Sequence, residues 1–431
     1  MASAAGELAR EMAMGLWRSA IVFGAFAASL GAAEAKPQWR EAFHSSPASY
    51  EAPAEEFIKF ASENWHVPED NLRANLTPQP VSGTIRYRVT LQAGGSEIRI
   101  RLSNEEGKAP VLLKAVSVGL AADAFSAKAG SLRSVTFGGR SSATIPAGAP
   151  LVSDALKLPV QPGSSLVVSL ATATTILNEG RGSAGFVVAE GDQTLREVLD
   201  QPKPLVGRPL VTSIAVLGKV PRGIIVTFGD SITDGNRAKP DALRGWPEVL
   251  ARRLAARKGG GSYTVLNAGI SGNRLLARSW GNAGLARLDR DALRIEGVTH
   301  LILLEGINDI NFSGRSPFGT NPEITADDLI SGYRQVIARA HARGIKVYIG
   351  TLTPQQRDEF TTAAKIAIRD SVNHWIRTSG EPDRVIDFDA MVRDPTSPAQ
   401  FKAEFDSGDH LHPGDKGYER MGSQIDLSLF P

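Results

Sequence analysis

The chain has 431 residues, of which 42% are hydrophobic and 22% are charged, and this composition predicts a globular protein with more than one domain. Its 48 Lys and Arg residues nearly balance 46 Asp and Glu residues, giving a formal net charge of +2. So weak a charge, without a run of basic residues interleaved with aromatics, argues against nucleic acid as a partner. The lack of Cys in the sequence excludes disulfides, thiolate catalysis and thiolate metal sites.

Residues 1–35 have the pattern of a secretory signal peptide. Arg10 and Arg18 precede the apolar run AIVFGAFAASLGA, and the sequence Ala33-Glu34-Ala35 after it resembles a cleavage signal. The apolar run is short for a membrane span, although an anchor or a buried helix is the alternative. We therefore expect a secreted or periplasmic protein without stable membrane insertion after cleavage, whose mature chain begins near Lys36.

The amino-terminal half beyond this segment is rich in β patterns. Residues 36–77 are an extension of uncertain structure, in which AEEFIKFASENW predicts a helix. From 78 to 220, short β segments are separated by Gly, Pro and Ser, and apolar residues alternate with arginines in 85–89 and 98–102. Closely spaced strands without an intervening helical pattern predict an all-β sandwich or jelly-roll domain.

Strand and helix patterns alternate in residues 221–431. Strands are predicted in IIVTF, YTVLNA, HLILLEG, KVYIGTL and VIDF, with helical patterns such as WPEVLARRLAAR and LARLDRDAL between them. In the helix predicted from Thr325 to Gly344, one apolar stripe consists of Leu329, Tyr333, Val336, Ile337 and Ala340. This alternation predicts a parallel sheet with helices on both faces.

Polar clusters follow three of the predicted strands, and a fourth lies near the carboxyl terminus. Ser231, the stretch 267–273 and Asn308-Asp309 follow the strands, and Asp409-His410-Leu411-His412-Pro413 comes last. Taken alone, Ser231 could be a helix cap, and the Asp-x-x-His pattern could be a surface pair. Because the carboxyl ends of parallel strands meet at one edge, the clusters together can supply a nucleophile, a base, an orienting carboxylate and oxyanion donors.

These clusters also carry a family resemblance. The blocks FGDSITDG, NAGISGNRLL, LEGINDI and DHLHP occur in the order found in the GDSL/SGNH hydrolases, which residues 221–431 resemble. The resemblance implies a flavodoxin-like three-layer α/β/α fold for this domain. The whole chain is similar to secreted bacterial members in which a β-sandwich domain precedes the hydrolase.

The resemblance also implies the roles of five residues. Ser231 would be the nucleophile, His412 the general base and Asp409 the carboxylate that orients it. The backbone N–H groups of Ser231 and Gly272 and the side-chain amide of Asn308 would form the oxyanion hole. His410 is the alternative base, but the Asp-x-x-His spacing favours His412.

Other polar residues have less specific interpretations. His300, His341 and His374 are expected to be structural, and Asp230 and Asp234 to be capping or turn residues rather than metal ligands. We expect no metal and no cofactor. Packing or solvation is the first interpretation of three residues that could still reach the pocket, namely Arg237, Trp246 and Arg274.

The sequence thus predicts an exported serine esterase that forms an acyl-enzyme on Ser231. The expected substrate is a small-molecule or polysaccharide ester with a short acyl group, acetyl above all, on carbohydrate. A lipid-directed esterase or lysophospholipase is the alternative, followed by a catalytically inactive carbohydrate-binding protein. The sequence does not determine the oligomeric state.

Overall fold

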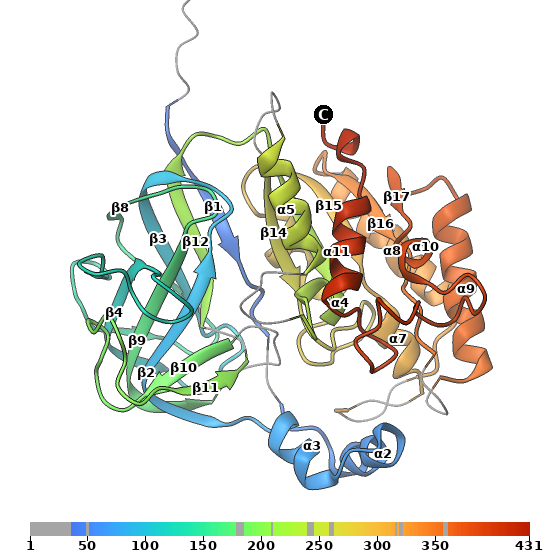
Figure 1. The fold of residues 1–431 in the computed structure, drawn as a ribbon, viewed down its shortest axis with the longest axis horizontal. Helices are drawn as coiled ribbons and strands as arrows, with labels where there is room; N and C mark the ends of the chain where they lie inside the picture. Colours follow the sequence, from blue (N-terminus) through green and yellow to red (C-terminus); the bar gives the residue numbers. More distant parts are fainter. Residues whose placement is uncertain are drawn as a thin grey trace, which may run out of the picture. The chain divides into compact units, whose positions relative to one another are not determined.

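A computed structural model describes residues 36–48, 51–177, 185–207, 210–238, 245–257, 263–314, 317–318, 322–356 and 361–431. The predicted signal peptide, residues 1–35, lies outside the described residues. Residues 38–431 form one unit, in which a β-rich region precedes a region of alternating strands and helices (Figure 1). Among the described helices, none has the length and apolar character needed to cross a membrane.

The β-rich region contains two antiparallel sheets. One has the order β1-β12-β3-β7, with β8 also paired to β3, and the other has the order β11-β10-β2-β9-β4-β5, with β6 also paired to β4. Its elements are β1 (Gln38–His44), α2 (Glu55–Trp65), α3 (Glu69–Leu76), β2 (Pro80–Thr90), β3 (Gly95–Ser103), β4 (Val111–Leu120), β5 (Arg133–Ser134), β6 (Ala143–Ile145), β7 (Pro150–Val152), β8 (Leu156–Val160), β9 (Ser165–Leu177), β10 (Gly185–Ala189), β11 (Lys203–Val206) and β12 (Val211–Gly218).

Apolar side chains from both sheets form one core cluster. Ile98, Ile100 and Leu102 of β3 belong to it, together with Ile85 of β2 and Val168 of β9. Such a shared core is consistent with the predicted sandwich or jelly roll. The extension that had no assignment from the sequence supplies β1, which pairs with β12, and the helices α2 and α3. The helix predicted within the extension corresponds to α2.

The arginine face of β2 is covered rather than exposed. Arg86 is fully buried, and its guanidinium donates to Ser169 Oγ at 2.7 Å and to the carbonyl oxygens of Arg196 at 2.6 Å and Glu197 at 3.0 Å. Burial lowers the pKa of Arg86 to about 10 because the charged form is desolvated. Arg86 therefore anchors the segment that follows β10.

The second region is built on a parallel sheet of order β14-β13-β15-β16-β17, and the predicted α/β class is confirmed. Its elements are β13 (Gly223–Gly229), α4 (Ser231–Asp234), α5 (Trp246–Ala256), β14 (Tyr263–Gly269), α6 (Gly284–Leu288), η2 (Asp289–Leu293), β15 (Val298–Leu304), α7 (Ile307–Asn311), α8 (Ala326–His341), β16 (Lys346–Gly350), α9 (Ala363–Thr378), β17 (Arg384–Ile386), α10 (Phe388–Val392), α11 (Asp415–Gln424) and η4 (Leu427–Leu429).

The strand order determines where helices and polar loops lie. Along the chain the order is 2-1-3-4-5, so the direction of strand addition reverses after the second strand. Right-handed crossovers then place α5 on one face of the sheet and α6 and α8 on the other. In agreement, α5 packs with α11, and α8 packs with α6 and α9. Ligands of such sheets bind outside the strands' carboxyl ends, beside this reversal.

Helix α8 follows its sequence prediction closely. Thr325 accepts from the backbone N–H of Asp328, whose carboxylate accepts from the backbone N–H of Thr325, forming a capping box. Gly344 has a φ of 71°, which suits a residue just beyond a helix. The predicted apolar stripe is buried and belongs to the core of this region.

Helices α2 and α3 pack against two loops of the second region. Phe57 of α2 lies with its ring centroid 6.0 Å from that of Trp280 and 5.8 Å from that of Phe312. Trp280 follows the β14 loop, and Phe312 follows α7. The insertion between β1 and β2 therefore supports the segments that follow the second and third polar clusters.

Candidate active site

Ser231 lies at the carboxyl end of the central strand β13. All seven residues of β13 are buried, and the Asp230 side chain caps the short helix α4 by accepting from the backbone N–H of Ile232 at 2.9 Å. Gly229 is required at this bend, because a Cβ there would lie 2.1 Å from the carbonyl oxygen of Leu304. The strand, the glycine and the cap together place Ser231 at the first position of α4.

The structure brings Ser231, His412 and Asp409 into one hydrogen-bonded line. Ser231 Oγ lies 2.8 Å from His412 Nε2, and His412 Nδ1 lies 2.7 Å from Asp409 Oδ2. Asp409 Oδ1 also accepts from the backbone N–H of His412 at 2.8 Å, which closes the turn between them. With Nδ1 donating to Asp409, Nε2 is an acceptor for the Ser231 hydroxyl. This geometry allows His412 to act as a base toward Ser231.

Asp409 stays ionised despite its burial. Desolvation favours its neutral form, but the hydrogen bond and charge interaction with His412, together with backbone N–H donors, outweigh it and hold the pKa of Asp409 well below its usual range. Arg237 Nε donates to Asp409 Oδ2 at 3.1 Å, but its side chain is 59% exposed, so we expect this ion pair to contribute little.

His410, the competing histidine, has a different partner. Its Nδ1 lies 2.5 Å from Asp406 Oδ2, and its side chain is 58% exposed. The turn therefore separates two Asp–His pairs, Asp406 with His410 and Asp409 with His412. Of these two histidines, His412 is the one in contact with Ser231.

Asn308 is held against the loop that contains Gly272. At the start of α7, Asn308 Nδ2 donates to the carbonyl oxygen of Asn273 at 3.0 Å. The neighbouring Asp309 accepts from the backbone N–H groups of Leu275 at 2.7 Å and Leu276 at 2.9 Å. Burial raises the pKa of Asp309 to about 6, although the two backbone donors oppose the rise. These contacts join the second and third polar clusters.

Gly272 has a conformation that other residues rarely adopt. Its φ is 79°, and a Cβ there would lie 2.4 Å from Trp280 Cε3. Glycine therefore lets the loop pass directly over the indole ring. In the described part of the chain, the backbone N–H groups of Ser231 and Gly272 have no hydrogen-bond acceptor, so both can donate to a bound oxyanion.

Arg287 organises the same sheet edge, and sequence reasoning missed it. The guanidinium donates to the carbonyl oxygen of Gly229, the last residue of β13, at 2.9 Å and to that of Ala268, the next-to-last residue of β14, at 2.7 Å. Its side chain is fully buried and lies 3.2 Å from Asp291 and 3.3 Å from Glu305. A signal existed, because Arg287 and Asp291 have the i, i+4 spacing of a helical ion pair.

Two of the buried carboxylates near Arg287, Asp230 and Glu305, have raised pKa values, whereas the pKa of Asp291 is lowered, despite its burial, by the charges of Arg290 and Arg287. Burial raises the pKa of Asp230 to about 7 and that of Glu305 well above its ordinary value. The charge of Arg287 lowers both pKa values but does not cancel the desolvation. The guanidinium also lies 3.8 Å from the centre of the Phe228 ring, which excludes water from that side. The edge beside Ser231 is thus a dry, charged network.

Several other residues considered from the sequence are buried or stabilise a turn. Trp246 is fully buried beside Phe388, and Arg274 is 2% exposed, so neither is open to solvent. Asp234 accepts from Ser271 Oγ at 2.7 Å, as expected of a turn acceptor. Burial lowers the pKa of His300 to about 4, so this histidine is neutral in the core.

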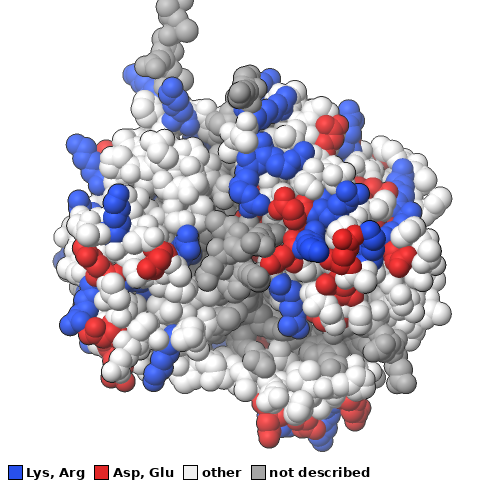
Figure 2. All heavy atoms as spheres, viewed as in Figure 1, with Lys and Arg blue, Asp and Glu red and all other residues white. Residues whose placement is uncertain are grey.

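The remaining two histidines lie on helices, as the sequence indicated. His341 of α8 pairs with Asp383 at 2.7 Å, and His374 lies in α9. Within the described ranges, no group of three or more His, Asp or Glu side chains is arranged to hold a metal ion. On the face drawn in Figure 2, the described acidic and basic side chains are interspersed.

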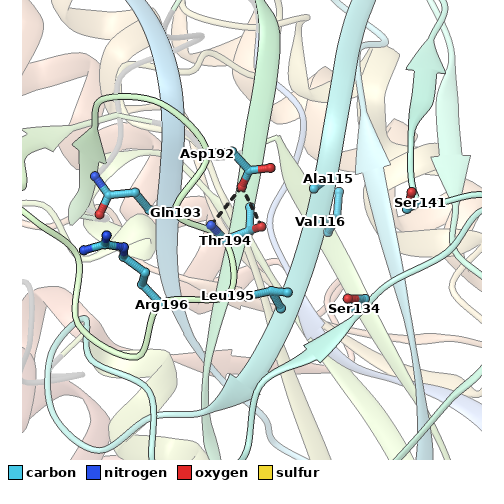
Figure 3. Close-up of a pocket in the computed structure, with 9 residues that line it drawn as sticks. All are labelled: Ala115, Val116, Ser134, Ser141, Asp192, Gln193, Thr194, Leu195 and Arg196. Atoms are coloured by element: carbon cyan, nitrogen blue, oxygen red, sulfur yellow. Dashed lines mark hydrogen bonds between the residues drawn. The ribbon is translucent and has the colours of Figure 1, made fainter.

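A cavity of about 340 Å³ lies elsewhere, in the β-rich region (Figure 3). It is lined by residues of β4, by Ser134 and Ser141, and by the segment 192–196. In the lining of this cavity, Asp192 Oδ1 accepts hydrogen bonds from the backbone N–H and the hydroxyl of Thr194. These two hydrogen bonds stabilise the local turn. Ser231, Asp409 and His412 do not line this cavity.

Residues 227–420 match the model of the GDSL-like Lipase/Acylhydrolase family. This domain therefore belongs to that family, and the resemblance predicted from the four sequence blocks is confirmed. The family consists of ester hydrolases, which makes ester hydrolysis the general activity of the domain.

About half of the chain, 48% in each case, is similar to solved structures at low identity. TesA is 22% identical (48% of this chain and 98% of that chain covered, TM-score 0.37), and a lipolytic G-D-S-L family protein from Veillonella parvula is 20% identical (48% and 97%, TM-score 0.33). The M. smegmatis aryl esterase is 16% identical (48% and 98%, TM-score 0.36). A comparison with curated proteins gave no match.

Proposed function

We propose that the protein is a serine esterase that forms and hydrolyses an acyl-enzyme on Ser231. The observation that carries this proposal is the line of contacts from Ser231 Oγ through His412 to Asp409, at 2.8 and 2.7 Å. His412 would take the Ser231 proton as Oγ attacks the ester carbonyl carbon, and would then donate that proton to the leaving alcohol. A water molecule activated by His412 would release the acid and restore Ser231.

The oxyanion of each tetrahedral intermediate would be bound by three donors. These are the backbone N–H groups of Ser231 and Gly272 and the side-chain amide of Asn308. They carry no net charge, and the surrounding carboxylates and Arg287 hold the loops in place before substrate binds. Preorganised donors of this kind favour the charged transition state over the neutral ester.

A fluorophosphonate probe tests the acyl-enzyme step directly. It should label the wild-type protein at Ser231, as shown by peptide mass spectrometry, and p-nitrophenyl acetate should be hydrolysed. Ser231→Ala should lose both the label and the hydrolysis. Thr233→Ser, in the same short helix, is the matched control and should retain both. Hydrolysis by Ser231→Ala at the wild-type rate would rule out the proposed nucleophile.

For the substrate, we propose short acyl esters on carbohydrate, with acetyl preferred. The family resemblance and the predicted export support this choice. The Trp280 and Phe312 rings are only 1% and 6% exposed, so they fill the space beside the Gly272 loop rather than line an open apolar channel. Turnover of p-nitrophenyl esters should fall steeply from acetyl to octanoyl, and an acetylated plant polysaccharide should release acetate. Faster turnover of octanoyl esters would favour the lipid-directed alternative.

We also propose that the protein is exported and cleaved before Lys36. The charged, apolar and small-residue segments of 1–35 support this proposal. Expression of the full chain in a Gram-negative host should place the protein in the periplasm or medium. Its amino-terminal sequence should begin near Lys36, and an intact amino terminus on a membrane-bound protein would contradict the proposal.

A further inference from the structure

The loop after β3 links the β-rich region to the hydrolase domain. Glu106 in this loop accepts a hydrogen bond from Asn282 Nδ2 at 2.8 Å and pairs with Arg290 Nη1 at 3.1 Å. The Glu106 side chain is 12% exposed, so the contact is largely shielded from water. Asn282 lies in the segment between β14 and α6, downstream of Gly272. A carboxylate of the first region is thereby hydrogen-bonded to the segment that follows the proposed oxyanion loop.

The hydrogen bonds continue from Asn282 to Asn308. The Asn282 carbonyl oxygen accepts from Asn273 Nδ2 at 2.9 Å, and the Asn273 carbonyl oxygen accepts from Asn308 Nδ2 at 3.0 Å. Asn273 is fully buried, and its Oδ1 accepts from Arg287 Nε at 2.8 Å. Both ends of the Asn273 amide are therefore engaged. A displacement of Asn282 would be transmitted to the backbone carbonyl that contacts Asn308.

The last contact determines how the Asn308 amide can donate. An amide nitrogen carries two hydrogens in one plane. When one of them points to the fixed carbonyl of Asn273, the direction of the other is determined, and the amide cannot turn its oxygen toward the substrate without breaking that bond. Donors in an oxyanion hole must be held close to the position of the developing charge to be effective.

We propose that Glu106, in the β-rich region, is a positioning residue for the Asn308 amide and acts through Asn282 and Asn273. The proposal rests on the proposed function, because it requires Asn308 to donate to an oxyanion on the Ser231 ester adduct. The β-rich region then contributes to turnover without contacting the substrate. Its effect is on the transition state and not on substrate affinity.

Steady-state kinetics of the full chain with p-nitrophenyl acetate test this proposal. Glu106→Ala should lower kcat about tenfold and change KM less than twofold, because a misplaced donor weakens the transition state most. Asn282→Ala removes the other partner of the same contact and leaves every charge in place, so it should show the same loss. An unchanged kcat in a folded Asn282→Ala protein would overturn the proposal, even if Glu106→Ala fails to fold.

A matched control breaks another contact to the hydrolase domain. We call the hydrogen-bonded series Glu106–Asn282–Asn273–Asn308 the relay. Glu296, which is 76% exposed, pairs with Arg40 of β1 at 2.8 Å and does not contact the residues of the relay. Glu296→Ala should keep the wild-type kcat. Glu106→Gln retains an acceptor for Asn282 and loses only the charge, so it should keep kcat within about threefold. If Glu106→Gln is as impaired as Glu106→Ala, the Arg290 pair carries the effect and the relay is wrong.

A double-mutant cycle separates the relay from the proposed function. In the Asn308→Ala background, Glu106→Ala should cause no further loss, because the donor that it positions is gone. The same tenfold loss in that background would overturn the relay while leaving the esterase assignment intact. The esterase assignment instead fails if Ser231→Ala turns over the ester at the wild-type rate.

Discussion

Arg86 in the β-rich region and Arg287 in the hydrolase domain are both fully buried, and they have different partners. Arg86 in the β-rich region donates to carbonyl oxygens and to a serine hydroxyl, whereas Arg287 in the hydrolase domain also contacts the carboxylates of Asp291 and Glu305. Desolvation lowers the pKa of both guanidinium groups. Arg86 holds a surface segment against its sheet, while Arg287 joins the strand ends beside Ser231.

This difference shows where the molecule concentrates buried charge. Carboxylates cluster at the sheet edge that carries the proposed chemistry, where Asp230, Asp309 and Glu305 all have raised pKa values because they are buried. Perturbed carboxylates in such numbers are typical of functional sites. In the β-rich region, buried polar groups such as Arg86 and Asn104 instead serve loops and turns.

The largest effect should come from the two histidines of the carboxyl-terminal turn. We expect His412→Ala to lower kcat/KM for p-nitrophenyl acetate by about ten-thousandfold, since it removes the base toward Ser231. His410→Ala should retain most activity, because His410 pairs with Asp406 instead. Arg86→Met, a variant in the other region, should also retain kcat. Loss of activity in His410→Ala with an active His412→Ala would reverse the assignment.

Arg86 and Arg287 should differ in their contribution to stability. Arg287→Met removes the ion-pair partner of the buried Glu305 and leaves the buried Asp291 with Arg290 alone, and it should lower the free energy of unfolding by about 3–5 kcal/mol. Arg86→Met leaves carbonyl oxygens without a donor and should cost about 1–3 kcal/mol. Urea unfolding followed by tryptophan fluorescence measures both. An equal or larger loss in Arg86→Met would contradict the distinction between the regions.

Two buried asparagines give a matched comparison of function. Asn308→Ala should lower kcat about 100-fold with KM nearly unchanged, because it removes a donor that acts mainly in the transition state. Asn104 in the β-rich region also donates to backbone carbonyls, at 2.8 Å for Ala109. Asn104→Ala should lower the melting temperature, and because Asn104 holds the loop that carries Glu106, kcat should fall no more than in Glu106→Ala, about tenfold. An effect of Asn308→Ala on KM alone would assign Asn308 to substrate binding.

The smallest effect concerns the pH dependence of stability. Asp230 has a folded-state pKa of about 7, above its ordinary value of 3.8, so the folded state binds more protons and stability falls as pH rises from about 4 to 7. Asp230→Asn keeps the cap and should reduce that fall.

Asp123, in an exposed turn of the β-rich region, has a lowered pKa because it accepts from the backbone N–H and side chain of Ser126. Its contribution is present above pH 4 and lost below it.

Chemical unfolding between pH 3 and pH 8 distinguishes the two aspartates. Asp123→Asn should change the stability profile only below about pH 4, where the wild-type carboxylate gains its proton. Asp230→Asn should change it between pH 4 and pH 7. A profile of Asp230→Asn that is parallel to the wild type over this interval would show that Asp230 does not carry the raised pKa.

Sequence patterns predicted the elements whose signals are local. The α8 stripe with its Thr325 cap needs only residues within one helix, and the alternation predicted in 98–102 lies within strand β3. The four sequence blocks also identified the family, because each is short and contiguous. Strand β1 was not predicted, because its pairing partner β12 lies about 175 residues further along the chain.

The sequence by itself determined the α/β class of residues 221–431 and their family. Its motifs also singled out Ser231, Asp409 and His412, which the structure places in one hydrogen-bonded line. Periodicity and short motifs carry this information without long-range contacts. Only the tertiary structure decided that His410 turns to Asp406, that Arg287 is buried among carboxylates, and that Glu106 contacts Asn282. These outcomes depend on packing between segments distant in sequence, because a side chain's partners and its desolvation are set by whichever segments the fold brings together.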